Sequence, residues 1–471
     1  MEKVFSFEAS SNSRISGSKL VFLDIVQDGH RVQAVCSLSK LEATGVTPEI
    51  FRNFYHIFRR GDIISVQGRP NRTKRGELSI SAEELPRLLS PSLARLPTKL
   101  EDPETRVRNR HADMLVNDRT SHTLRARSYI IQHIRDFLLK DNFLEVQTPI
   151  LADGAGGATA RPFTTSATEF PDKQLALRIA PEIWLKRLIL GGMERVFEIG
   201  SAFRNEGLDA THNPEFTTCE FYKSFADLED LIFMTEDLVH GLADLVGSLQ
   251  ETKLTAIPEL EPARFKGPFR RVEFIPAIEK ALGSSLPDLT AETAAEEIKS
   301  IFKSQSVPLP SSPTLPRLLD KLASVYIEPH CDEPTFILHH PACMAPLSKS
   351  FVDPATTQLV SARAELFIGH REIANMYEEE NSPFEQRAKF VQQAKWRDEE
   401  NRAVVDESYL EALEWGLPPT GGWGCGVDRL CMLFTGSSRI SDVQAFGSLK
   451  NVVGLGPQPP KEASSDEKSS V

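Results

Sequence analysis

Two strand-like runs on either side of a polar loop constrain the fold of this chain more than any other stretch. The first run spans residues 196–203, the second spans residues 216–222, and the loop between them holds glycine, asparagine and proline. Alternating apolar residues around a turn-rich loop predict an antiparallel hairpin. Because strand side chains alternate between faces, one face should carry Phe216, Thr218, Glu220 and Tyr222.

That face is predicted to line a binding pocket. It combines an aromatic ring, a hydroxyl, a carboxylate and a phenol, and a carboxylate that is buried without a partner is costly. The alternative is a surface hairpin whose charges only solvate it. The pocket is favoured, because aromatic and ionic residues alternate on the face that should meet a sheet core.

Length and composition place the chain among soluble globular proteins. Its 471 residues suggest two or three domains, and 40% of them are apolar and 25% charged. No apolar run approaches the roughly 20 residues that span a bilayer, so no membrane partner is expected. The net charge, 54 − 66 = −12, disfavours non-specific nucleic-acid binding, so an RNA partner would have to meet local basic patches. The six cysteines form no CxxC pair and are interpreted as reduced core thiols.

The hairpin and two further stretches resemble the sequence motifs of one enzyme family. FRNEG followed by HNPEFTTCEFY, residues 203–222, resembles motif 2 of class II aminoacyl-tRNA synthetases, in the form found in lysyl-tRNA synthetases. GLPPTGGWGCGVDRLCMLF, residues 416–434, resembles motif 3, and NFLEVQTPIL, residues 142–151, resembles motif 1. The resemblance extends from about Lys19 to Gly447.

The resemblance implies an α+β fold with two main parts. An N-terminal OB-fold β-barrel for anticodon binding is expected at residues 1–95, and strand-like runs at 19–25, 31–37, 62–68 and 77–81 suit it. Its first strand is expected to be atypical, because Glu8–Ser11 stands where the family has a Gly-Arg pair. After a linker at 96–120, a class II catalytic domain with an antiparallel sheet flanked by helices is expected at 121–455. It would hold a helical insertion at about 225–330 and precede a disordered tail at 456–471.

Three residues of the expected barrel match the family's anticodon contacts. Phe22 and Gln33 are spaced like the ring that stacks on an anticodon base and the amide that reads a base edge, and Arg14 would contact phosphate. A base stacked on a ring contributes about 1–3 kcal/mol. The alternative is that Phe22 is an ordinary core residue of the barrel.

A helix at about residues 121–140 is predicted from its apolar stripe, formed by Ile130, Ile134, Phe137 and Leu138. It leads into motif 1, which ends at Pro149. In the family this helix and strand form the interface of a homodimer. Ordinary helix packing within one chain is the alternative that the sequence leaves open.

The resemblance also assigns the groups that would bind L-lysine. The carbonyl of Gly157 and the carboxylate of Glu182 would hold the α-amino group, although Glu182 taken alone suits a helix N-terminus. Strand alternation places Asn375, Tyr377 and Glu379 on one face, where the family positions meet the substrate carboxylate, its aliphatic stem and its ε-ammonium. At the far end, Glu379 would surround the ε-ammonium together with Glu220 and Tyr222.

The same resemblance implies ATP as the second substrate. Arg204 would bridge the substrate carboxylate and the α-phosphate, and Arg429 would meet the γ-phosphate beside an adenine covered by Phe216. Further ATP contacts are expected from Glu206, His212 and Asn213. Two carboxylates, Glu365 and Glu372, match the family's Mg²⁺ ligands, and hard oxygen ligands suit that ion. Lysine would thus form lysyl-adenylate and then pass to the 3′ end of tRNA(Lys).

Two other functions remain possible from the sequence. One is a lysyl-synthetase paralogue that modifies a protein, which the expected N-terminal barrel disfavours. The other is a catalytically impaired homologue that acts as an RNA-binding or regulatory protein, which the presence of Arg204 and Arg429 disfavours. The stretches APEIWLKRL and NMYEEENSP resemble mitochondrial-type fungal lysyl enzymes, so the mitochondrial matrix is the expected compartment, with the cytoplasm as the alternative.

Overall fold

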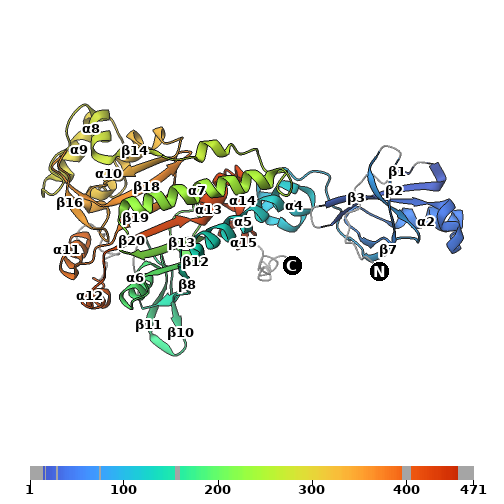
Figure 1. The fold of residues 1–471 in the computed structure, drawn as a ribbon, viewed down its shortest axis with the longest axis horizontal. Helices are drawn as coiled ribbons and strands as arrows, with labels where there is room; N and C mark the ends of the chain where they lie inside the picture. The colour runs from blue at the N-terminus through green and yellow to red at the C-terminus, as the bar shows by residue number, and fades with distance from the viewer. Residues whose placement is uncertain are drawn as a thin grey trace, which may run out of the picture. The chain divides into compact units, whose positions relative to one another are not determined.

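The computed structural model describes residues 14–15, 17–27, 30–73, 76–153, 160–394 and 405–453. The chain divides into two compact units, one that reaches to His122 and one from Thr123 to Val453 (Figure 1). Both combine helices with strands, as the expected α+β class requires. Gly157, the atypical stretch Glu8–Ser11 and the tail at 456–471 lie outside the described residues.

The first unit is built on a five-stranded sheet in the order β1-β2-β3-β6-β5. Its strands are β1 (Arg14–Ile15), β2 (Leu20–Gln27), β3 (His30–Ser37), β5 (Gly68–Arg72) and β6 (Leu78–Ala82). A separate pair joins β4 (Ile63–Ser65) to β7 (Arg87–Ser90). The predicted runs at 19–25, 31–37 and 77–81 are confirmed as strands. The strands of the described residues do not close into a barrel, because the short β4 pairs with β7 and not with the main sheet.

Alternation along β2 explains which face of this sheet is the core. Val21, Leu23 and Ile25 are buried, whereas Phe22 is half-buried on the opposite face. The helix α2 (Pro48–Ile57), which the sequence analysis did not anticipate, adds buried Phe51 to this core. Its start has ordinary capping chemistry, since the Thr47 side chain accepts a hydrogen bond from the Ile50 N–H at 3.2 Å. Shorter elements are η1 (Gly17–Lys19), α1 (Leu38–Leu41) and η2 (Glu42–Thr44).

The predicted linker contains two short helices, α3 (Pro103–Arg108) and α4 (Arg110–Val116). The buried carboxylate of Asp113 organises them: it accepts bonds from Arg106 at 2.8 Å and from the Thr120 hydroxyl at 2.8 Å. Arg110 also pairs with Asp113, at 3.2 Å. Two arginines of the linker are therefore committed to this internal network.

An eight-stranded sheet forms the centre of the second unit, in the order β14-β15-β18-β19-β20-β13-β12-β8. Inner neighbours are antiparallel, and the pairs at the two ends, β14–β15 and β12–β8, are parallel. Its strands are β8 (Leu144–Glu145), β12 (Arg195–Phe203), β13 (Glu215–Ser224), β14 (Arg270–Glu273), β15 (Thr335–Leu338), β18 (Arg363–Ile368), β19 (Arg371–Glu378) and β20 (Thr420–Gly426). The predicted hairpin is confirmed as β12 and β13.

Three helices cover one face of this sheet: α5 (Asp118–Lys140), α7 (Leu228–Gln250) and α13 (Val427–Thr435). Figure 1 shows α7 lying across the strands. The core between these helices and the sheet takes alternate strand residues, among them Phe221 and Trp423, whose rings stack 4.9 Å apart. The predicted α5 stripe is confirmed, because Ile130, Ile134 and Leu138 are fully buried there. The other face of the sheet carries the polar residues of β13.

A second core lies beside β15 and holds the helices α8 (Phe274–Leu282), α9 (Ala294–Ser304) and α10 (Leu315–Tyr326). The predicted insertion at 225–330 therefore contains two different parts, since α7 packs in the main core and the later helices form their own. Other elements of the unit are β9 (Leu151–Ala152), β10 (Thr164–Ala167), β11 (Phe170–Leu177), α6 (Glu182–Leu190), η3 (Pro262–Phe265), η4 (Glu328–His330), η5 (Ala342–Met344), β16 (Ser350–Val352), β17 (Leu359–Ser361), α11 (Pro383–Ala394), α12 (Glu407–Leu413), α14 (Ile440–Val443) and α15 (Leu449–Val452).

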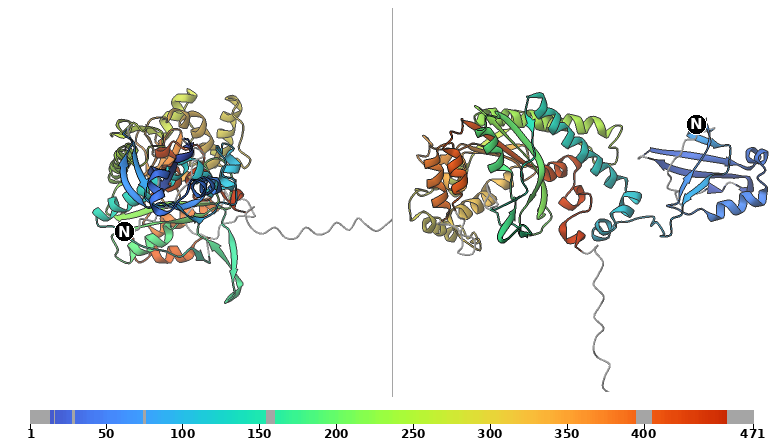
Figure 2. Two further views of the ribbon diagram at one scale, coloured as in Figure 1. Left: turned by 90° about the vertical axis from the view of Figure 1, so that its right-hand side faces the viewer. Right: turned by 90° about the horizontal axis from the view of Figure 1, so that it is seen from below.

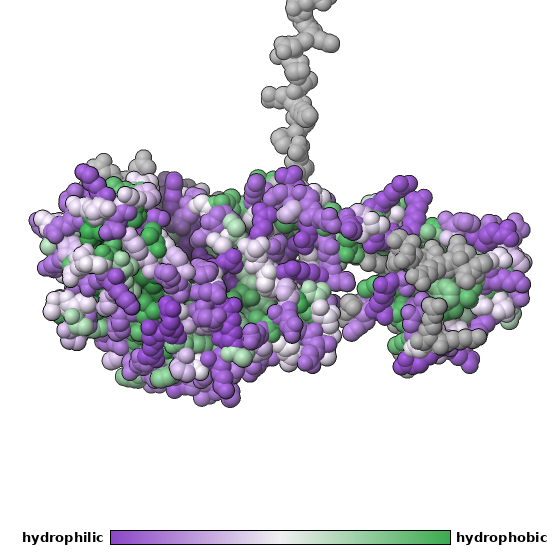
Figure 3. All heavy atoms as spheres, turned by 90° about the horizontal axis from the view of Figure 1, so that it is seen from above, coloured by the Kyte–Doolittle hydropathy of each residue, from purple (hydrophilic) through white to green (hydrophobic). Residues whose placement is uncertain are grey.

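Strands β10 and β11 form a hairpin that stands out from the second unit (Figure 2). On the face drawn in Figure 3, hydrophilic side chains cover most of the surface and hydrophobic ones lie scattered among them. Within the part of the chain that the structure describes, no helix is both long and apolar enough to span a membrane.

Candidate active site

Four neighbouring strands build the floor of the candidate site. In the sheet register Glu220 and Tyr222 of β13 lie opposite Gly424 and Gly422 of β20, and these glycines lie opposite Asn375 and Tyr377 of β19. Directly opposed residues share a face. Two residues of β18 extend the same row, since Arg363 lies opposite Tyr377 and Glu365 lies opposite Asn375. The sheet thus brings most predicted site residues onto one surface.

A cavity of about 190 Å³ opens above this floor. Its lining includes the predicted residues Glu182, Arg204, Glu220, Tyr222, Asn375 and Tyr377. The glycines of β20 have no side chain, so they leave the space above the sheet open. A Cβ on Gly422 would lie 1.9 Å from Glu379 Oε1 and 2.7 Å from the Tyr222 ring, so only glycine fits there.

One end of the cavity is acidic. Glu220 accepts a hydrogen bond from the Tyr222 hydroxyl at 3.3 Å, and no ion pair to Glu220 is found among the described residues. Burial, reinforced by the charge of Glu182, raises the pKa of Glu220 to about 8. Glu182 lies at the first turn of α6 and accepts a hydrogen bond from the Tyr377 hydroxyl at 3.0 Å. An unpaired buried carboxylate beside a second acid is a site for a cationic ligand group.

Glu379 lies at the same end, but behind the cavity wall. Its side chain is fully buried and forms an ion pair with the ammonium of Lys186. Among the described residues, the lining of the cavity includes neither Glu379 nor Lys186. Lys186 also lies 2.7 Å from Glu182 Oε1. Burial acts to lower the pKa of Lys186, but the two carboxylates outweigh it and raise that pKa well above its usual range. Glu379 is one of the residues predicted from the sequence, and Lys186 is not.

The other end of the cavity is cationic. Arg204 follows β12 directly, and its guanidinium lies 5.2 Å from the centroid of the Phe216 ring. Its Nε is buried without a hydrogen-bond partner among the described residues. A buried donor of this kind is costly unless a ligand satisfies it. Arg363 also lines the cavity, where it lies opposite Tyr377 and pairs with Glu365, and its Nε donates to Asn375 at 3.0 Å. A carboxylate or a phosphate suits this end.

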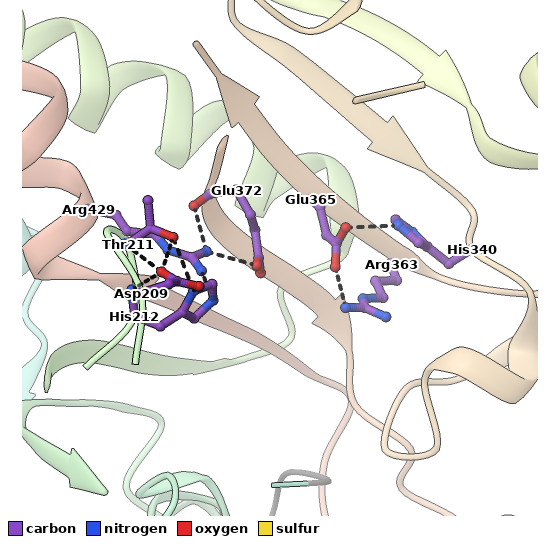
Figure 4. Close-up of polar contacts among 8 residues, drawn as sticks. All are labelled: Asp209, Thr211, His212, His340, Arg363, Glu365, Glu372 and Arg429. Carbon is purple, nitrogen blue, oxygen red and sulfur yellow. Dashed lines mark hydrogen bonds and ion pairs between the residues drawn. The ribbon is translucent and has the colours of Figure 1, made fainter. Parts of the chain in front are cut away.

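The predicted motif 3 arginine is joined to the motif 2 loop (Figure 4). Arg429 Nη2 lies 2.9 Å from His212 Nε2, and His212 Nδ1 lies 2.8 Å from Asp209 Oδ2. Arg429 also lies 3.2 Å from a carboxylate oxygen of Glu372. This chain of contacts holds the guanidinium between the loop and β19, as a group that meets an anionic ligand would need.

The two predicted metal ligands lie on neighbouring strands (Figure 4). The register of β19 skips Ile373 where β18 passes from Leu366 to Phe367, so that Glu372 lies opposite Phe367 and reaches the face of Glu365. Desolvation and the charge of Glu365 raise the pKa of Glu372. Burial alone would raise the pKa of Glu365, but Arg363 and His340 hold it down to about 2. Two facing carboxylates that repel each other form a suitable oxygen donor pair for a divalent cation.

Other predicted residues lie away from these contacts or outside the residues that the structure describes. The amide of Asn213 is engaged in fixing the C-terminal elements: it donates to Glu215 O at 2.6 Å and accepts from Leu449 N–H at 3.0 Å. Glu206 is exposed in the loop after Arg204. In the first unit, Phe22 lies opposite Arg14, and the next outward residue of β2, Asp24, lies opposite Gln33. The three predicted anticodon residues thus come from three adjacent strands.

Two cationic residues of the site escaped sequence reasoning. Lys186 stands four residues after Glu182 in α6, a spacing that usually indicates an exposed ion pair on a helix surface. Its burial depends on Glu379, which is remote in sequence. Arg363 was detectable, because it precedes Glu365 by two residues and so shares its strand face.

Comparison with known proteins agrees with this geometry. Residues 102–450 match the family model of tRNA synthetases class II (D, K and N), and residues 6–88 match that of the OB-fold nucleic acid binding domain. The chain belongs to the class II tRNA synthetases of the D, K and N group.

The similar proteins among curated sequences are lysine–tRNA ligases. The mitochondrial lysine–tRNA ligase of Schizosaccharomyces pombe is 44% identical over 451 residues, which cover 94% of this chain and 83% of the relative. Lysine–tRNA ligase cla4 of Cladosporium cladosporioides is 41% identical over 452 residues, 93% of this chain and 74% of the relative. A probable cytoplasmic lysine–tRNA ligase of Enterocytozoon bieneusi is 41% identical over 444 residues, 91% and 84% of the two chains.

Proposed function

We propose that this chain activates L-lysine with ATP and transfers it to the 3′ end of tRNA(Lys). The observation that carries the proposal is the polarity of the cavity: the unpaired acid Glu220 lies at one end and the unsatisfied Arg204 at the other. A molecule with an ammonium at its tip and a carboxylate at its head matches this arrangement. The similarity to lysine–tRNA ligases over nine-tenths of the chain supports it.

The reacting groups meet at the cationic end. Arg204 contacts the lysine carboxylate and the α-phosphate of ATP, and stabilises the negative charge that develops as the carboxylate attacks phosphorus. Phe216 and Arg429 enclose the adenine, and Arg429 with His212 meets the γ-phosphate. Asn375, which Arg363 orients at 3.0 Å, positions the carboxylate for in-line attack. Pyrophosphate then leaves, and the tRNA ribose hydroxyl attacks the mixed anhydride.

The acidic end recognises the substrate side chain. Glu182, together with the carbonyl of Gly157, holds the α-ammonium, and Tyr377 packs on the aliphatic stem. Glu220 and Tyr222 meet the ε-ammonium, and Glu379 adds its negative charge from behind the cavity wall. A neutral side chain of the same shape would leave these acids unpaired, and that cost is the basis of specificity.

Mg²⁺ fits the pair Glu365 and Glu372, because both present carboxylate oxygens on one face and Glu372 carries a raised pKa beside its neighbour's charge. When bound, the ion would neutralise phosphate charge. Glu206 and Asn213 remain proposed ATP contacts, through the adenine amino group and through the shape of the motif 2 loop respectively.

The first unit would bind the anticodon. Phe22 is half-buried on the outward face of β2, where a ring is available for stacking, and Gln33 and Arg14 stand on the adjacent strands. The match of residues 6–88 to an OB-fold nucleic acid binding domain favours a tRNA acceptor over a protein acceptor.

A homodimer through the motif 1 segment completes the proposal. Three large apolar residues of this segment are exposed, Leu144 by 50%, Leu151 by 48% and Ile150 by 43%, and β8 forms an edge of the sheet. A second copy would cover them. Sedimentation of Leu144→Glu should give a monomer where the unmodified chain gives a dimer.

The mitochondrial matrix is the proposed compartment, since the relative from Schizosaccharomyces pombe is a mitochondrial enzyme at 44% identity. Fluorescence imaging of the tagged protein in its own cells tests this proposal.

ATP–pyrophosphate exchange measured across the twenty amino acids tests the proposed function. Lysine should support exchange, and the same preparation should charge a tRNA(Lys) transcript. Exchange with a different amino acid, or charging without lysine-dependent exchange, would contradict the proposal.

A further inference from the structure

The lysine end of the site already contains an ammonium group of the chain itself. Lys186 has no exposed surface, and its ammonium contacts the carboxylates of both Glu182 and Glu379. Three phenol rings surround it, with centroids 5.9 Å away for Tyr222, 5.9 Å for Tyr377 and 5.8 Å for Tyr409. A buried cation between two acids and three rings is held in one place.

This internal ammonium lies directly behind the substrate cavity. Tyr222 and Tyr377 line the cavity on one side and face Lys186 on the other. Their hydroxyls donate to the two acids that do line the cavity, to Glu220 at 3.3 Å and to Glu182 at 3.0 Å. The position of each acid therefore depends on a ring that packs around Lys186.

The charges of this group match the proposed substrate. With all four groups ionised, as the binding of lysine requires, the three carboxylates of Glu182, Glu220 and Glu379 and the ammonium of Lys186 carry −3 + 1 = −2. Lysine brings two ammonium groups to these acids, its α-ammonium to Glu182 and its ε-ammonium to Glu220. Without Lys186 the same acids would carry one uncompensated buried charge, which is costly.

Building on the proposed function, we infer that Lys186 is a positioning and specificity residue for lysine activation. Its ammonium fixes Glu182 and Glu379 and sets the charge of the pocket to the value that two substrate ammonium groups neutralise. It touches neither substrate nor ATP, and acts through the acids and the tyrosines. The alternative is that Lys186 and its two carboxylate partners form buried ion pairs that only stabilise the fold.

A double-mutant cycle separates these two roles. The four proteins are the unmodified chain, Lys186→Met, Glu379→Gln and the double variant, each tested for lysine-dependent ATP–pyrophosphate exchange, for the KM of ATP and for thermal stability. Lys186→Met removes the cation and leaves an unpaired acid. Glu379→Gln removes an acid and leaves the buried ammonium with Glu182 as its one remaining carboxylate partner among the described residues, so that less negative charge remains for the substrate. The double variant restores the charge of −2.

Lys389→Met is the matched control. Lys389 pairs with Glu380 at 2.6 Å and is also largely buried, but it faces Ser348 O and lies outside the cavity lining. Its loss should lower stability without changing the KM of lysine or of ATP beyond about threefold, under 1 kcal/mol.

The expected result is a selective effect on lysine, which a purely structural role does not produce. Each single variant should lose on the order of a hundredfold in kcat/KM for lysine, with the KM of ATP nearly unchanged. Removal of Lys186 from Glu379→Gln should then improve lysine activation, on the order of tenfold. The comparison of the double variant with Glu379→Gln tests the role of Lys186 even where Lys186→Met alone fails to fold.

Three outcomes would overturn the inference. One is a Lys186→Met protein within about threefold of the unmodified chain for lysine. The second is a double variant that is less active toward lysine than Glu379→Gln, because that contradicts the proposed charge balance. The third is a folded unmodified chain without lysine-dependent exchange, which would overturn the proposed function as well and is recognised before any variant is measured.

Discussion

The carboxylate of Asp428 accepts a hydrogen bond from the backbone N–H of Thr217 at 2.7 Å and thereby joins the start of α13 to β13. Each partner stands next to a residue that is proposed to enclose the adenine, since Arg429 follows Asp428 and Phe216 precedes Thr217. Arg127 of α5 completes the junction, with bonds of 2.6 Å to Asp428 and 2.8 Å to the Thr217 hydroxyl. Three elements from distant parts of the sequence, α5, α13 and β13, thus hold Arg429 and Phe216 beside the proposed adenine site.

Arg127→Met should weaken ATP binding. The substitution leaves the mostly buried Asp428 without its cation, so the spacing of Arg429 and Phe216 becomes less defined. We expect the KM of ATP to rise about tenfold, a change of about 1.4 kcal/mol, and the KM of lysine to rise less. Arg387→Met, which removes an exposed pair with Glu407, is the control. An unchanged KM of ATP in Arg127→Met would show that the positions of Arg429 and Phe216 do not depend on α5.

Gly422→Ala should damage lysine recognition selectively. The added Cβ would overlap Glu379 Oε1 at 1.9 Å and displace it from Lys186. We expect kcat/KM for lysine to fall on the order of a hundredfold, as for a broken buried ion pair. Gly426→Ala on the same strand is the control, because its Cβ has no atom nearer than 3.8 Å. Equal KM values for lysine in the two alanine variants would refute the proposed crowding.

Lysine activation should depend on pH through Glu220. Burial and Glu182 raise the pKa of this acid to about 8, against the opposing effects of Arg204, Arg178 and the Tyr222 hydroxyl. At pH 7 the group is mostly protonated in the free enzyme, and only the carboxylate binds an ammonium. We therefore expect kcat/KM for lysine to rise with pH up to about 8 and then level off.

The control for this pH dependence is Glu220→Gln, in which the rise should vanish together with most of the activity. Substrate titration does not produce the effect, because a lysine side chain stays protonated up to about pH 10. A profile that is flat from pH 6.5 to 8.5, or a rise that persists in Glu220→Gln, would count against this assignment.

Phe22→Ala should separate tRNA binding from amino-acid activation. Phe22 is half-buried on the outward face of β2, so its loss removes a stacking surface worth about 1–3 kcal/mol per base. The KM of tRNA should rise at least about fivefold, with lysine-dependent exchange unchanged. Phe51→Ala, which empties the core of the same unit, should instead lower thermal stability. A parallel loss of exchange and charging in Phe22→Ala would identify Phe22 as structural.

The sequence was sufficient to predict the surface of the site wherever strand alternation applies. Glu220, Tyr222, Asn375 and Tyr377 follow the period of two, and the sheet register brings them together as expected. Glu372 does not follow that period from Asn375, and it reaches the site because Ile373 of β19 is an extra residue in the pairing with β18. A bulge depends on pairing with the neighbouring strand, so the pattern of one strand does not reveal it.

Charges that pair across long sequence distances were also beyond prediction. Lys186 follows a helical surface pattern, and only the folded sheet places Glu379 against it. Likewise, the strands β2, β3 and β6 of the first unit were predictable from alternation, whereas the pairing of β4 with β7 depends on which partner each short strand meets. The local sequence pattern determines where helices and strands form. The tertiary structure determines which charged groups become neighbours.

The central claim is that lysine carboxylate and ATP react beside Arg204, and Arg204→Ala in lysine-dependent ATP–pyrophosphate exchange tests it most directly. The substitution removes a partly buried cation with no ion pair among the described residues, so the fold should persist, as circular dichroism and thermal unfolding can verify. The account predicts that exchange falls by a factor on the order of a thousand or more, because charge stabilisation at the reacting phosphorus is lost. Exchange within about tenfold of the unmodified chain, in a folded Arg204→Ala protein, would contradict it.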